Sequence, residues 1–60
     1  MKEEWFIKWL QDEGYSFWYE YNGNEVWQSP KYVLVWHTDT GVRFQIANED
    51  YSEEYIQSLL

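Results

Sequence analysis

The sequence predicts an α+β fold: a four-stranded antiparallel meander flanked by an N-terminal and a C-terminal helix, in the order α-β-β-β-β-α. Apolar residues recur at helical spacing near both ends of the chain, and period-two alternation fills the middle. Two turn sequences, Asn22-Gly23 and Asp39-Thr40-Gly41, divide that middle into hairpins. With 60 residues and no linker or internal repeat, we expect residues 1–60 to form a single small domain.

The N-terminal helix is predicted over residues 2–13, a segment that contains no Gly or Pro. Its large apolar residues recur at i, i+1, i+4 and i+5 and form one wide stripe: Trp5, Phe6, Trp9 and Leu10. Charged residues occupy the opposite side, and Gly14 is a natural stop for the helix.

The first hairpin is predicted from residues 15–21 and 24–29, joined by Asn22-Gly23. This dipeptide favours a type I′ turn, which needs a positive φ at both central residues. A two-residue turn sets three cross-strand pairs: Tyr19 with Val26, Trp18 with Trp27, and Glu20 with Glu25. The last pair carries like charges and disfavours this register mildly, so the register stays open.

The second hairpin follows Ser29-Pro30 and is predicted from residues 31–38 and 42–47. A three-residue loop, Asp39-Thr40-Gly41, would place Trp36 opposite Phe44 and Leu34 opposite Ile46. The apolar residues of the two strands match in that register, which favours the pairing.

The C-terminal helix is predicted to follow Asp50, with Asp50 and Glu53 in the positions of a capping box. Glu53 and Glu54 then lie in the first turn, where the helix dipole favours negative charge. The apolar face of this helix comprises Tyr51, Tyr55, Ile56, Leu59 and Leu60.

The number of large rings exceeds what one small core needs, which predicts an interface. If both helices pack on the face that carries Leu34 and Trp36, the other face exposes four apolar side chains: Trp18, Trp27, Val33 and Val35. Aromatic side chains with a charged rim are typical of protein interfaces. We therefore expect a homodimer or another protein partner.

The formal net charge of −7 restricts the partners. It opposes direct binding to nucleic acid and to anionic membranes, both of which require Lys and Arg. It favours a protein partner with a basic surface. The N-terminal segment has neither a long apolar core nor a cleavage site, and no stretch is long enough to span a membrane, so we expect a cytoplasmic location.

Residue combinations that carry catalysis or bind metals are nearly absent from the sequence. There is no cysteine, and the single histidine, His37, lies in a strand beside valines. No glycine-rich phosphate loop and no calcium-loop spacing is present. We expect neither an enzyme nor a bound metal or cofactor.

These observations favour a non-enzymatic, acidic protein-binding module. The profile is similar to that of small phage or mobile-element proteins that inhibit a host protein, some of which mimic DNA. The expected target is a nucleic-acid-handling protein, bound through these residues: Trp18, Glu20, Glu25, Trp27, Glu49, Asp50, Glu53 and Glu54. Two alternatives remain open, an assembly subunit that acts by homodimerisation and a small ligand- or carbohydrate-binding domain.

Overall fold

The computed structural model describes residues 3–60 and confirms the predicted element order. The elements are α1 (Glu4–Asp12), β1 (Ser16–Tyr21), β2 (Asn24–Gln28), β3 (Tyr32–His37), β4 (Val42–Ala47), the 3₁₀ helix η1 (Asn48–Asp50) and α2 (Glu53–Leu59). All strands are antiparallel to their neighbours, in the spatial order β1-β2-β3-β4. Residue 2, which the sequence places in the first helix, lies outside the described residues.

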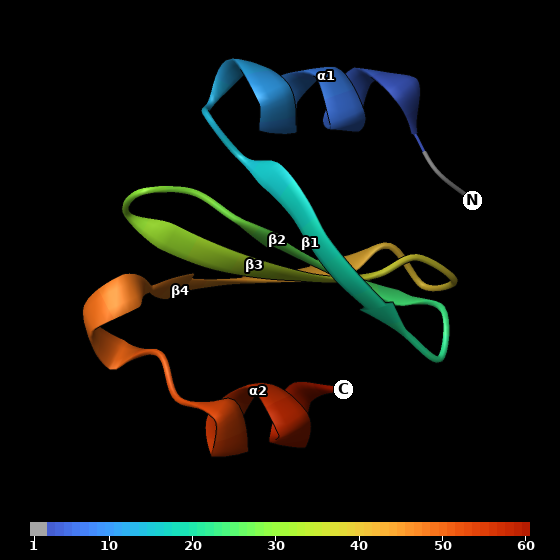
Figure 1. Cartoon of the computed structure of the whole chain (residues 1–60). Helices are drawn as coiled ribbons and strands as arrows, with labels where there is room; N and C mark the ends of the chain where they lie inside the picture. The colour runs from blue at the N-terminus through green and yellow to red at the C-terminus, as the bar shows by residue number, and fades with distance from the viewer. Residues whose placement is uncertain (1–2) are drawn as a thin grey trace.

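The two helices cover opposite faces of the sheet (Figure 1), so the expectation that both pack on one face is wrong. Beneath α1 lies an aromatic core: Phe6, Leu10, Tyr15, Trp27, Leu34 and Trp36. Beneath α2 lies an aliphatic core: Val26, Val33, Val35, Ile46 and Ile56. Val33 and Val35, expected on an open face, are therefore buried.

The length of the loop between β3 and β4 explains why the side chains of β4 lie on the other face than predicted. His37 pairs with Val42, so the loop between β3 and β4 has four residues, 38–41, rather than three. The loop is closed by a hydrogen bond from the Gly41 N–H to the His37 carbonyl (2.7 Å), and Gly41 adopts a φ of 80°. Because side chains alternate along a strand, the extra residue turns Phe44 and Ile46 to the opposite face from Trp36.

The first hairpin has the expected turn, since Asn22 and Gly23 have φ values of 51° and 81°. Tyr19 pairs with Val26 and Glu20 pairs with Glu25, as predicted. The predicted pairing of Trp18 with Trp27 is wrong, because Phe17 pairs with Trp27 and Trp18 is the extra residue of a β-bulge.

The C-terminus of α1 and the N-terminus of α2 each have a common capping motif. After α1, the Gly14 N–H donates to the Gln11 carbonyl (3.1 Å) and the Tyr15 N–H donates to the Leu10 carbonyl (2.8 Å), which is a Schellman motif. The capping box predicted at Asp50 is wrong. Asp50 belongs to η1, and α2 is capped by Ser52, whose hydroxyl accepts from the Tyr55 N–H (3.2 Å).

Candidate functional site

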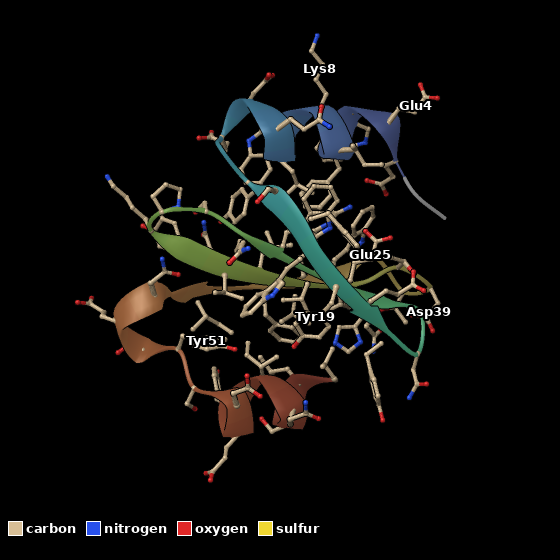
Figure 2. All side chains as sticks on the ribbon, viewed as in Figure 1. Glu4, Lys8, Tyr19, Glu25, Asp39 and Tyr51 are labelled. Carbon is tan, nitrogen blue, oxygen red and sulfur yellow. The ribbon has the colours of Figure 1, made fainter. Side chains whose placement is uncertain are left out.

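The bulge in β1 holds a tryptophan at the surface beside the segment that leads into α2. Trp18 is 38% exposed. Its ring lies 5.3 Å from that of Tyr19 and 5.8 Å from that of Tyr51. In Figure 2, Tyr19 lies between the sheet and α2, and Tyr51 lies just before α2. We call Trp18, Tyr19, Tyr51 and Glu53 the Trp18 patch.

The bulge accounts for the position of this ring. In a regular ladder, Trp18 would point to the face opposite Tyr19. The extra residue places two successive rings, Trp18 and Tyr19, in edge-to-face contact on the α2 side of the sheet. Tyr19 and Tyr51 pack against the aliphatic core and contact the Trp18 ring, which remains partly exposed to solvent.

Glu53 gives the patch negative charge. Burial raises the pKa of the Tyr19 phenol, and the neighbouring Glu53 carboxylate raises it further. The same two causes, in the same order, raise the pKa of Tyr51. A hydrogen bond from the Tyr51 phenol to the Glu53 carboxylate also raises the pKa of Tyr51, so these two side chains are linked at the edge of the patch.

Further carboxylates flank the patch along the chain. Glu49 and Asp50 precede Tyr51, Glu54 follows Glu53, and all of these acidic side chains are exposed. Ser52, not Asp50, caps α2, so Asp50 has no helix-capping role. Among residues 3–60, no Lys or Arg forms an ion pair with these carboxylates. Segment 49–54 therefore carries negative charges that no described Lys or Arg pairs with, and its Tyr51 contacts the exposed indole of Trp18.

Three residues predicted for partner binding lie elsewhere. The expected exposure of Trp27 and Glu25 is wrong, because they are only 7% and 1% exposed beneath α1. The indole N–H of Trp27 donates to the Glu25 carboxylate (3.0 Å), so each satisfies a polar group of the other. Glu20 is exposed, but as the cross-strand partner of Glu25 it lies on the α1 face, away from Trp18.

Sequence reasoning missed the contribution of Tyr19 and Tyr51. The sequence predicts Tyr19 only as the cross-strand partner of Val26 and Tyr51 as part of the apolar face of the C-terminal helix, whereas both are half-buried beside Trp18. Their role depends on the β-bulge and on the 3₁₀ helix, neither of which has a clear sequence signal here. The like-charged pair of Glu20 and Glu25 does not indicate the bulge either, because this pair is kept in the structure and the register shift lies at Trp18.

The single histidine does not take part in a metal-binding group in the described part of the chain. His37 is half-buried, and its ring lies 5.7 Å from that of Phe44 in an edge-to-face arrangement. Residues 3–60 contain no group of His, Cys, Asp or Glu side chains that could hold a metal ion. No helix in this range is long and apolar enough to cross a membrane. Comparison with protein-family models, curated proteins and solved structures finds no match to the chain.

Proposed function

We propose that this chain is a non-enzymatic protein-binding module that binds a partner with a basic surface through the Trp18 patch. The observation that supports this proposal is the position of Trp18, an indole held at the surface by a bulge and in contact with Tyr51, whose segment carries carboxylates that no described Lys or Arg pairs with. A cation that sits over an indole ring gains favourable electrostatic energy. The same Lys or Arg can pair with Glu53 or its acidic neighbours.

The charge distribution of the whole chain favours this type of partner. Eleven acidic side chains face four basic ones in the sequence. Of the basic residues in the described part, Arg43 is paired with Glu3 (2.7 Å), and Lys8 points away from the sheet on the outer side of α1 (Figure 2). A basic partner is thus attracted at long range, and the exposed ring fixes the contact.

Within this proposal, we expect the partner to be a nucleic-acid-handling protein and the chain to be its inhibitor. Such proteins carry basic clefts that neutralise phosphates, and segment 49–54 presents carboxylates that compete for the same cleft. Duplex or single-stranded DNA should then displace the chain from its target. A target whose binding to the chain is unaffected by excess DNA would contradict the inhibitor proposal, but not the basic-partner proposal.

The experiment compares matched variants as baits and then measures binding kinetics on the captured protein. Trp18→Ser removes the central ring, whereas Trp5→Ser removes a more exposed tryptophan (64%) from α1 as a control. We expect Trp18→Ser to lose the partner and Trp5→Ser to retain it. A triple variant, Glu49→Gln with Asp50→Asn and Glu54→Gln, should slow association and flatten its salt dependence.

Two outcomes would contradict the proposal. One is equal binding by Trp5→Ser and Trp18→Ser. The other is an affinity that is indifferent both to salt and to the triple variant. Each variant is first checked for cooperative unfolding, because a loss of binding is informative only in a folded chain.

Homodimerisation as the main function has less support than the sequence suggested. The expected stacking of two sheets depended on an open face with Trp27, Val33 and Val35, and all of these are buried. The strand edges of β1 and β4 are the part of the sheet that no other strand covers. The oligomeric state stays a prediction, to be measured by sedimentation.

A further inference from the structure

A concave surface lies on the α1 side of the sheet, away from the Trp18 patch. It is a groove of about 460 Å³ between the end of α1 and the turn from β2 to β3. The residues that line it come from α1 and the chain just after it, from the turn between β2 and β3, and from β3 and β4: Trp9, Glu13, Tyr15, Ser29, Pro30, Lys31, Tyr32 and Gln45. Its volume is in the range of sites that bind small ligands.

Two aromatic side chains in the groove remain accessible. Trp9 and Tyr32 are each 39% exposed, on different elements. Trp9 is fixed by near-parallel stacking, with its ring 5.5 Å from Phe6 and 6.0 Å from Tyr15. The ring of Tyr32 contacts no other ring among residues 3–60, so its surface is available to a ligand.

The polar groups of the groove include both donors and acceptors. The Gln45 side-chain amide donates to the Tyr15 hydroxyl (2.8 Å), which leaves the Gln45 carbonyl oxygen as an acceptor and the Tyr15 O–H as a donor. Glu13 adds an exposed carboxylate and Lys31 an exposed ammonium. Their charges cancel, so this groove is locally neutral on a chain of net charge −7.

We infer that this groove is a binding site for a neutral oligosaccharide. A sugar ring has an apolar face that packs against an aromatic ring, and hydroxyls that each donate and accept hydrogen bonds. The groove provides both requirements, with Tyr32 and Trp9 as apolar walls and with Glu13, Lys31 and Gln45 around them. Local neutrality favours an uncharged ligand over an anionic one, which the net charge of the chain repels.

A proline-rich peptide is the main competing occupant, because such peptides also dock on aromatic grooves. Proline has no N–H, so a run of prolines offers acceptors and no donors. It would itself donate no hydrogen bond to the Glu13 carboxylate or to the Gln45 carbonyl oxygen, both of which are exposed. A saccharide satisfies these acceptors together with the donors from Lys31 and Tyr15.

The test is an NMR titration of the ¹⁵N-labelled chain with cellotetraose, chitotetraose and maltotetraose in separate arms. We expect at least one of them to shift the Trp9 indole N–H and the Gln45 side-chain amide in a saturable way. Tyr32→Ala should weaken that binding about tenfold, the upper end of what one aromatic contact contributes. Tyr21→Ala removes an equally polar, exposed ring outside the groove and should leave the affinity unchanged.

Exposed-site variants keep the test independent of folding. Glu13→Ala and Lys31→Ala change side chains that lie at the surface, and they should weaken binding by removing the acceptor and the donor, respectively. The inference is overturned if none of the saccharides shifts Trp9 and Gln45, or if Tyr32→Ala and the two exposed variants leave binding unchanged. It is also overturned if a decaproline peptide shifts these signals and the saccharides do not. None of these outcomes involves Trp18.

Discussion

The two faces of the sheet are covered by different kinds of packing. Under α1 the core consists mainly of rings, and the Glu25 carboxylate and the Arg43 guanidinium contact these rings. Under α2 it consists of valines and isoleucines, with tyrosines at its margin. Rings bury a large area per residue but carry N–H and O–H groups that need partners, whereas branched aliphatic side chains need none.

Arg43 illustrates the consequence on the α1 side. Its guanidinium lies 3.8 Å from the centre of the Phe6 ring and 5.4 Å from that of Trp36, and it pairs with Glu3 at 2.7 Å. The arginine thus acts as part of the aromatic layer, with its charge compensated by a residue just before α1. Among residues 3–60, no charged side chain is buried on the α2 side of the sheet. The comparison shows how a chain without cysteines can use one arginine to complete a small core.

The largest expected effect is on the aromatic core. Trp36 is fully buried and packs edge-to-face on Phe6 at 4.9 Å. Trp36→Ala should lower the free energy of unfolding by about 3–5 kcal/mol, and Ile56→Ala in the aliphatic core by about 2–5 kcal/mol. Urea denaturation measures both.

If Trp36→Ala unfolds the chain completely, Trp36→Phe provides a smaller change. It also removes an indole N–H that has no hydrogen-bond partner among residues 3–60. If Ile56→Ala lowers the free energy of unfolding clearly more than Trp36→Ala does, the prediction that the aromatic core contributes more stability than the aliphatic core is wrong.

A smaller effect is expected from Arg43. Arg43→Met keeps most of the apolar stem but removes the charge, and should destabilise the fold by about 1–2 kcal/mol through the lost cation–π contact and ion pair. Arg43→Lys keeps the charge without the planar guanidinium and should recover only part of this loss. If Arg43→Met does not lower the free energy of unfolding at low salt, the guanidinium does not stabilise the aromatic core and this prediction is wrong.

The smallest effect concerns the tyrosines at the margin of the α2 core. The pKa values of Tyr19 and Tyr51 are raised by burial and by Glu53, so folding favours the protonated phenols. Their contribution to stability is complete below the unfolded pKa of 10.0 and is lost as pH rises through the folded pKa. Glu53→Gln should lower the alkaline midpoints in an absorbance titration of the tyrosines, and Glu4→Gln on α1 should not.

The sequence predicts the element types and their order because the periodicities are strong. It predicts the type I′ turn because Asn22-Gly23 favours a positive φ at both positions. It does not predict the layers, because these depend on whether Thr38 belongs to strand β3 or to the loop after it. That one residue reverses the face of Phe44 and Ile46 and leads to the wrong expectation of an open sheet face.

The candidate site is predictable only in part, for the same kind of reason. Trp18 and the acidic residues of segment 49–54 stand out by composition, and they are indeed exposed. The burial of Trp27 and Glu25 and the contact of Trp18 with Tyr51 depend on tertiary register, which includes a one-residue bulge. Local sequence patterns do not encode either feature.

The most direct test of this account is the register of β3 against β4, measured by cross-strand nuclear Overhauser effects. The account predicts that Val35 is opposite Phe44 and that Trp36 is opposite Arg43, with strong effects between these backbones. That register puts Ile46 on the face opposite Trp36, where it packs with Ile56 of α2. Strong effects between Trp36 and Phe44 and between Leu34 and Ile46 would contradict it, because the sheet would then have one open apolar face.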